Sequence, residues 1–166
     1  HWPCAGARAV EDTLAAWRGL ETALEANLTR AIGVSNFNAS LLEQLLPRMK
    51  HPPVVNQCGY SIGAHNNSQN TVQGGDDRTA QFCRARGISY SAYSPLGGLS
   101  GVDVLRNPRV QAVARAHGVS AAQVALRWLV QQNISIVTAA TNPEYIREDI
   151  DLFSFQLTAA EMVALA

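Results

Sequence analysis

Residues 30–37, RAIGVSNF, indicate the fold class more clearly than any other stretch of the sequence. Their apolar run ends in Ser35 and Asn36, two small hydrogen-bonding residues, and the chain passes at once into NASLLEQLLPRM, residues 38–49. The leucines of this second stretch recur at helical spacing. The pattern therefore predicts a buried strand with a polar tip, followed by a helix with Asn38 or Ser40 as its N-cap.

The same alternation continues along the chain. Apolar runs at residues 52–60, 88–98 and 134–141 predict three further strands, and amphipathic stretches predict helices over 10–29, 76–87, 107–133, 142–150 and 157–166. We expect residues 107–133 to break at Gly118 and restart at a Ser120 cap, and Thr158 and Glu161 to form a capping box. Strands alternating with helices, with continuous apolar runs in the strands, predict an α/β fold whose parallel sheet is buried on both faces.

The first predicted helix and the loop after the second strand carry two more expectations. The apolar stripe of the helix over 10–29 consists of Leu14, Trp17, Leu20, Leu24 and Leu28. Residues 61–77, SIGAHNNSQNTVQGGDD, are rich in Gly and Asn. We expect a mobile surface loop there, beyond the carboxyl end of a strand, where α/β proteins bind ligands.

Composition narrows the classes of partner. The 166 residues are 47% hydrophobic and 16% charged, with zero net charge, so no overall field attracts nucleic acid or an anionic membrane. No apolar run approaches the roughly 20 residues of a membrane span. Three widely spaced cysteines, Cys4, Cys58 and Cys83, fit neither a disulfide framework nor a metal site and predict buried free thiols. We expect a soluble protein of a reducing compartment, the cytoplasm or an organelle interior.

All four predicted strands end in polar or special residues. These are Ser35 and Asn36, Asn56 and Gln57, Tyr93 and Ser94, and Thr141 and Asn142. The carboxyl ends of parallel strands share one face, where amides can bond a carboxamide and an aromatic ring can stack on a heterocycle. The set predicts a site for a nucleotide with an amide-bearing ring. Taken singly, Ser35–Asn36 could be a capping turn, Gln57 a satisfied buried amide, Tyr93 a core aromatic and His1 a solvated imidazole.

Six segments, taken in order, resemble landmarks of the aldo-keto reductase family: HWP, RAIGVSNF, VVNQCGY, AYSPLGG, QVALRWLVQQNI and TNPEYIREDIDLFSFQLTAAEM. The resemblance covers essentially the whole chain. It implies a TIM (β/α)8 barrel, of which residues 1–166 are about the second half, the last strands and helices. It also implies a single partial domain, residues 1–166, of an NADP-dependent oxidoreductase that transfers hydride to an aldehyde or ketone.

The resemblance also assigns roles. His1 matches the histidine that orients the carbonyl, and no metal is expected. The cofactor contacts that it implies, nicotinamide end first, are Ser35, Asn36 and Gln57, then the stacking residue Tyr93, then Ser94 and Leu96 at the pyrophosphate, and Glu148 and Asp149 at the adenine. Thr141 and Asn142, predicted from their place at the tip of the last strand, complete the candidate cofactor site.

Two departures from the family pattern stand out. Ala139, Ala140 and Tyr145 occupy positions where family members usually carry the Lys-Ser pair and the Arg that hold the 2′-phosphate of NADPH. Charge-assisted contacts of that kind contribute about 1.5–3 kcal/mol each. NADP(H) is expected by resemblance, but NAD(H) use and the absence of a cofactor both stay open.

The second departure concerns the Asp, Tyr and Lys of the family's catalytic tetrad, which have no counterpart here. Lys50, the only lysine, precedes the strand over 52–60 and is expected to lie opposite the strand tips, whereas Tyr60 could face the cleft. We expect the three residues in an amino-terminal half missing from this sequence, which would complete the site for a small carbonyl substrate, and the 166-residue chain alone to be inactive. The alternative is a non-catalytic structural or regulatory subunit of a complex, whose open barrel edges a protein partner or second copy covers.

Overall fold

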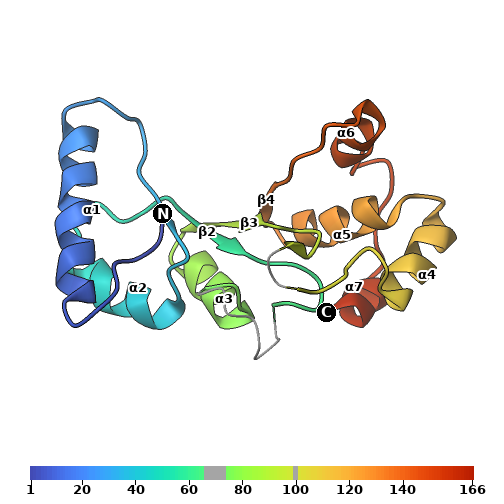
Figure 1. Ribbon diagram of the computed structural model, residues 1–166, viewed down its shortest axis with the longest axis horizontal. Coiled ribbons are helices and arrows are strands. Elements are labelled where there is room, and N and C mark those ends of the chain that lie inside the picture. Colours follow the sequence, from blue (N-terminus) through green and yellow to red (C-terminus); the bar gives the residue numbers. More distant parts are fainter. Residues whose placement is uncertain (66–73, 99–100) are drawn as a thin grey trace. The chain divides into compact units, whose positions relative to one another are not determined.

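The computed structural model describes residues 1–65, 74–98 and 101–166. Within them the chain forms four strands in the order β1-β2-β3-β4, and the β1–β2 and β3–β4 pairs are parallel (Figure 1). The predicted α/β class and the parallel pairing are confirmed. The described residues group into two compact units: the first comprises residues 1–58 and 74–90, and the second comprises 59–65, 91–98 and 101–166.

The first unit places three helices around the β1–β2 pair. They are α1 (Ala9–Glu25), α2 (Ala39–Leu45), which continues into the 3-10 helix η1 (Leu46–Arg48), and α3 (Asp77–Ala85); the strands are β1 (Val34–Ser35) and β2 (Val55–Gly59). Helix α2 packs between α1 and α3. Asn38 caps α2 by accepting a hydrogen bond from the Leu41 N–H at 2.8 Å, as the sequence predicted, so the chain turns directly from β1 into this helix.

The apolar stripe predicted for the first helix is only partly right. Leu14 and Trp17 are buried, but Leu20 is 44% exposed and Leu28 is 80% exposed. Leu28 lies beyond the end of α1, because the chain leaves the helix at Asn27 with a φ of 57°. The polar Glu21 takes the buried place on this face, one turn after Trp17.

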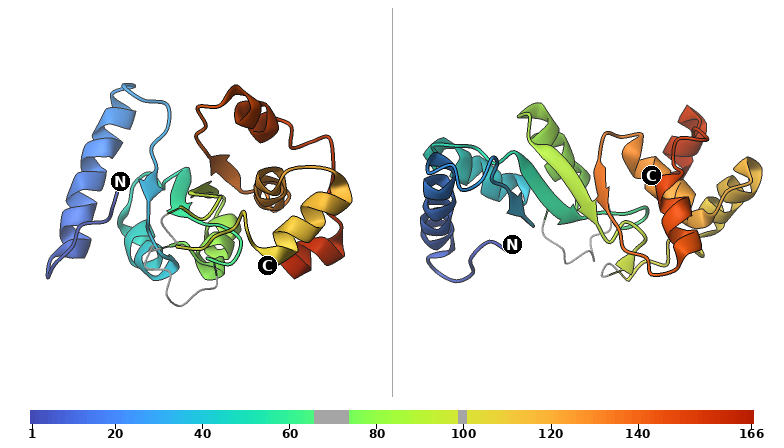
Figure 2. Two further views of the ribbon diagram at one scale, coloured as in Figure 1. Left: turned by 45° about the vertical axis from the view of Figure 1, so that its right-hand side comes forward. Right: turned by 90° about the horizontal axis from the view of Figure 1, so that it is seen from above.

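The second unit is built around its most apolar helix, α5. Its elements are β4 (Ser135–Val137), the greater part of β3 (Ser89–Tyr93), α4 (Pro108–His117), α5 (Ala121–Val130), α6 (Pro143–Ile150) and α7 (Ala159–Leu165). Helix α5 contacts α4, α6 and β4, and α4 lies beside α7 in every view (Figure 2). The predicted caps are confirmed: Gly118 ends α4 with a φ of 65°, and Ser120 and Thr158 each form a capping box.

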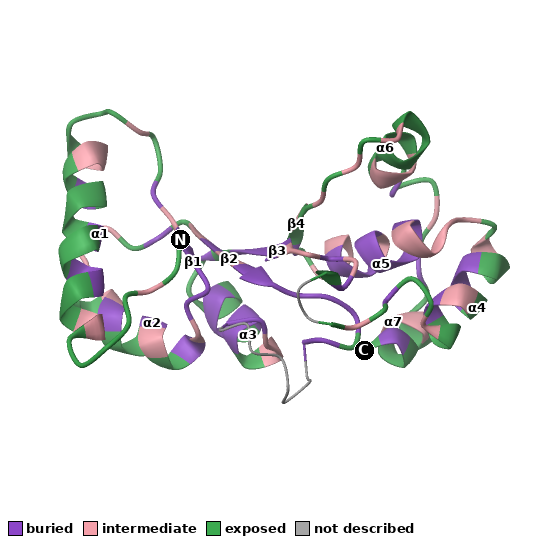
Figure 3. Cartoon of the chain, viewed as in Figure 1, coloured by how far each residue is buried: buried purple, intermediate pink, exposed green. Residues whose placement is uncertain are grey.

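Burial departs from the prediction in the last strand. Residues 90–92 of β3 are buried, but Ser135 and Val137 of β4 are exposed (Figure 3). Strand β4 is the last in the strand order, so it has a neighbour on one side only. The expectation of a sheet buried on both faces is therefore wrong for β4.

The segment after β2 was expected to be a surface loop, and its first residues are instead part of a core. Ser61, Ile62, Ala64 and His65 are buried, and the His65 ring lies 5.1 Å from the Trp128 ring. Aromatic packing therefore draws this polar stretch inward. Residues 66–73 lie outside the described residues.

Two of the three cysteines match the prediction. Cys58 and Cys83 are buried free thiols, whereas Cys4 is an exposed thiol, which corrects the expectation. Cys4 precedes α1 in an irregular segment, where its N–H donates to the Thr13 hydroxyl at 3.0 Å. Among the described residues, no helix reaches the length and hydropathy that a membrane span requires.

Candidate functional site

A cavity of the second unit lies where β4 leads into α6. It measures about 570 Å³ and is lined by Leu96, Leu105, Gln111, Ser120, Ala121, Ala122, Thr138, Ala139, Ala140, Thr141, Tyr145, Glu148 and Asp149. Local sequence positions these walls: Asn142 caps α6 by accepting from the Glu144 N–H at 2.9 Å, and Pro143 occupies the first turn. Four alanines in the lining leave the space open.

The polar chemistry of this cavity is acidic. Glu148 and Asp149 both line it, and burial, followed by the neighbouring Glu148 charge, raises the pKa of Asp149 above its ordinary value. None of the residues described as lining the cavity is a lysine or arginine. Arg147 on α6 is not among them.

The cavity gathers several of the residues predicted from the sequence. Leu96, Thr141, Glu148 and Asp149 all line it. Asn142 does not, because its side chain caps α6. Tyr93 and Ser94 precede Leu96 at the end of β3 and are both half-buried.

A tight turn follows Ser94, whose φ is 50°. The Gly97 N–H donates to the Ser94 carbonyl at 3.0 Å. Gly97 has a φ of 103°, and a side chain there would collide with the Val102 carbonyl. The turn therefore requires glycine at position 97.

Three predicted residues of the first unit form one hydrogen-bonded cluster where the end of β1 pairs with the middle of β2. The Ser35 hydroxyl donates to the Gln57 carbonyl at 2.7 Å, and the Asn36 side-chain amide donates to the Ser35 hydroxyl at 3.0 Å. The Asn36 backbone N–H also donates to the Gln57 carbonyl, at 3.0 Å. Asn36 is fully buried, whereas the half-buried Gln57 keeps side-chain surface for a ligand.

The cluster also bears on the simpler interpretations of these residues. Asn38, and not Ser35 or Asn36, supplies the cap of α2. Gln57 is half-buried rather than enclosed. Asn36 has a φ of 64°, a left-handed backbone conformation that asparagine tolerates better than most residues, at the point where the chain leaves β1.

Asn56 does not share the face of Gln57 and is a correction to the predicted row of polar tips. It is fully buried, its amide donates to the Phe37 carbonyl at 2.7 Å, and its side-chain oxygen accepts from the Cys58 thiol at 3.4 Å. Successive side chains of a strand point to opposite faces, so Asn56 and Gln57 diverge. Asn56 is therefore a structural residue, and strand alternation was the signal for it.

His1 lies on the surface of the first unit. Its imidazole is exposed and meets the Trp2 ring edge-on at 5.8 Å. Both residues border a hollow of about 80 Å³ that Trp17 and Gly33 also line.

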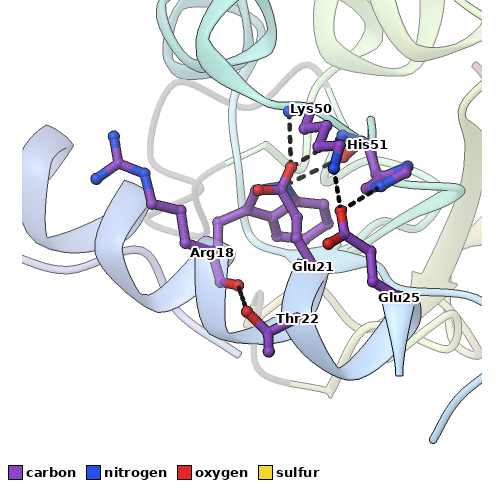
Figure 4. Close-up of polar contacts among 7 residues, drawn as sticks. Arg18, Glu21, Thr22, Glu25, Lys50 and His51 are labelled. Atoms are coloured by element: carbon purple, nitrogen blue, oxygen red, sulfur yellow. Dashed lines mark hydrogen bonds and ion pairs between the residues drawn. The ribbon is translucent and has the colours of Figure 1, made fainter. Parts of the chain in front are cut away.

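Lys50 and Tyr60 are the two residues that could have replaced the tetrad Lys and Tyr, and both are engaged in other contacts. The Lys50 ammonium pairs with Glu25 at 2.7 Å (Figure 4). Tyr60 is 3% exposed and stacks on Trp128 at 6.1 Å, so the expectation that it could face a cleft is wrong. Figure 4 also shows Glu21, a buried carboxylate that is not among the predicted site residues.

Comparison with known proteins places these features in a family context. The model of the Aldo/keto reductase family matches residues 1–166. D-galacturonate reductase of Fragaria ananassa is 38% identical over 155 residues, which cover 91% of this chain and 46% of that protein.

Solved structures agree with the family match. MGS-M4, an aldo-keto reductase from a Medee basin deep-sea metagenome library, superposes with a TM-score of 0.84 at 31% identity, over 99% of this chain and 56% of that one. A Gox0644 mutant in complex with NADPH gives a TM-score of 0.82 at 28% identity, over 99% and 55%. The chain spans about half the length of the curated relatives it matches.

Proposed function

Since this chain belongs to the aldo-keto reductase family, we propose that it carries the cofactor-binding residues of an oxidoreductase that transfers hydride from NAD(P)H to an aldehyde or ketone. We also propose that residues 1–166 form part of one such domain. The assignment rests on the family match, on the cavity of the second unit and on the hydrogen-bonded cluster of the first.

The observation that carries the proposal is the convergence of predicted residues on one cavity. Leu96, Thr141, Glu148 and Asp149 come from two loops and a helix, and all four line the same space of about 570 Å³. That volume lies within the roughly 300–1,000 Å³ typical of small-molecule sites. Its alanines and leucines suit a flat adenine ring, its carboxylates can accept from the adenine amino group, and its hydroxyls suit a ribose.

The remaining cofactor contacts are proposed from the strand tips. As the family membership implies, Gln57, whose backbone carbonyl accepts from Ser35 and Asn36, would bond a nicotinamide carboxamide. Tyr93, in the second unit, is proposed as the ring-stacking residue on the family membership alone. The Ser94 hydroxyl and the backbone N–H groups of its turn would meet the pyrophosphate, while Asn142 would act by fixing the start of α6. A bound nicotinamide cofactor supplies the hydride.

His1 is the residue of this chain proposed to act on the substrate. Its exposed imidazole would donate an N–H to the carbonyl oxygen and orient the carbonyl. Reduction also needs a proton for that oxygen. Because Tyr60 is buried and Lys50 is paired with Glu25, we propose that the tyrosine donor, with its aspartate and lysine, comes from chain outside these 166 residues.

Turnover by the protein in its native length tests the proposal. We expect oxidation of NADH or NADPH with at least one of a panel of aldehydes and ketones. His1→Ala should lower kcat/KM by about 100-fold, the usual cost of losing one donor to a developing oxyanion, with cofactor affinity unchanged. His51→Ala, which removes another surface imidazole, is the matched control. No turnover across the panel would favour the non-catalytic alternative, and full activity in His1→Ala would remove the role given to His1.

A further inference from the structure

We infer that the cavity of the second unit selects a dinucleotide whose adenosine ribose carries two free hydroxyls, NAD(H), over one that carries a 2′-phosphate, NADP(H). The inference rests on the proposed function, because it assumes that the adenosine end of a dinucleotide enters this cavity. It goes further by assigning the choice of cofactor to the charge of the cavity wall.

The first argument concerns what a 2′-phosphate needs. A phosphate monoester carries about −1.5 to −2 charges near neutral pH and is normally held by lysine, arginine or several N–H donors. Among the residues described as lining the cavity, none is a lysine or arginine. Ala139 and Ala140, which form the wall between β4 and α6, have side chains that cannot donate a hydrogen bond.

The second argument concerns what the wall offers instead. Glu148 and Asp149 are consecutive, both half-buried, and both line the cavity. A carboxylate beside the adenosine end repels a 2′-phosphate but does not oppose a ribose that carries two free hydroxyls. Burial, and then the neighbouring Glu148 charge, raises the pKa of Asp149 above its ordinary value.

Binding to the native-length protein tests the inference without relying on turnover. NAD⁺ and NADP⁺ are titrated by calorimetry, and 5′-AMP and 2′,5′-ADP are titrated in parallel as probes of the adenosine end alone. We expect NAD⁺ to bind about tenfold more tightly than NADP⁺ or better, with 5′-AMP favoured over 2′,5′-ADP in the same order. Equal or tighter binding of NADP⁺ would overturn the inference and leave the proposed function standing. Failure of both dinucleotides to bind would overturn the proposed function as well.

Charge variants assign the effect to the cavity wall. Glu148→Gln and Asp149→Asn should each lower the NADP⁺-to-NAD⁺ ratio of dissociation constants by roughly three- to tenfold. Glu144→Gln is the matched control, because it makes the same change on α6 at a residue outside the described lining of the cavity. An equal shift in the control would overturn the assignment to Glu148 and Asp149.

A variant that adds a positive charge tests the same inference if the variants that remove a carboxylate fold poorly. Ala139 is exposed, so Ala139→Lys adds a cation at the wall without filling the core. It should tighten NADP⁺ binding by roughly tenfold while leaving NAD⁺ binding unchanged. A variant that tightens both nucleotides equally would show that the 2′ position does not lie at this wall.

Discussion

At the scale of single residues, Glu21 shows how a buried charge can hold a fold together. One of its oxygens accepts from the Trp17 indole at 3.1 Å and from the backbone N–H groups of Lys50 and His51 at 2.7 and 2.9 Å. These bonds join the end of α1 to the segment that leads into β2 (Figure 4). A carboxylate is buried as deeply as Glu21 only when its oxygen atoms accept hydrogen bonds. Glu21 is therefore a structural residue.

Replacing Glu21 therefore carries a defined cost. Glu21→Ala leaves the backbone N–H groups of Lys50 and His51 without their acceptor, whereas the Trp17 indole keeps the His51 carbonyl at 3.1 Å. It should lower the free energy of unfolding by about 1–3 kcal/mol, measured by urea denaturation. Glu25→Ala is the control, since Glu25 pairs with the Lys50 ammonium and the His51 imidazole at the surface. We expect a smaller loss there. Equal losses for the two variants would contradict the structural role of Glu21.

At the scale of elements, α7 is held by its first turn and by its neighbours. Thr158 and Glu161 form the capping box, the Trp128 indole donates to the Met162 carbonyl at 3.1 Å, and His117 of α4 meets Glu161 at 2.9 Å. The Thr158 backbone N–H is the chief cause of the lowered pKa of Glu161, and the Thr158 hydroxyl and His117 add to it. Glu161 thus connects the start of α7 to the end of α4.

The lowered pKa of Glu161 predicts a dependence of stability on pH. In the unfolded chain the carboxyl titrates near its ordinary value of 4.5. Its contribution is therefore fully present above that pH and is lost as the pH falls through the lower folded-state pKa. Denaturation across this acidic range should show the wild type losing its advantage over Glu161→Gln, while Glu144→Gln provides the control. A difference that stays constant down to the lowest pH would contradict the assignment.

At the scale of the whole molecule, the chain matches about half the length of its curated aldo-keto reductase relatives. It spans 46% of the D-galacturonate reductase that it matches at 38% identity. Lys50 and Tyr60, the residues nearest in type to the missing tetrad, are engaged with Glu25 and Trp128. Neither Lys50 nor Tyr60 is therefore placed as a substitute for the tetrad residues that we propose to lie outside these 166 residues.

We accordingly expect the 166-residue chain, produced alone, to reduce no aldehyde or ketone with either NADH or NADPH. The measurement is loss of reduced nicotinamide at high protein concentration, with the native-length protein assayed beside it. The physical reason is the absence of a proton donor for the carbonyl oxygen. Turnover by the chain alone that His1→Ala abolishes would contradict this expectation and would require a donor among the residues described above.

The sequence and the structure agree best where the determinants are local. The caps at Asn38, Ser120 and Thr158 and the helix end at Gly118 stand where the sequence predicted them. Each depends on a side chain or a backbone angle within a few residues of its own position. Leu96, Glu148 and Asp149 were assigned through family resemblance and Thr141 through its place at a strand tip, and all four line one cavity.

The disagreements come from contacts between residues far apart in the chain. Tyr60 and His65 lie in the core because Trp128 packs against both, and β4 is exposed because it ends the strand order. Neither fact is present in the local pattern of apolar and polar residues. The sequence by itself determined the element types, their caps and the family, since these follow from short-range chemistry and recurring motifs. Only the tertiary structure decided which polar side chains are buried as supports and which line the cavity, because burial depends on what the rest of the fold places against each residue.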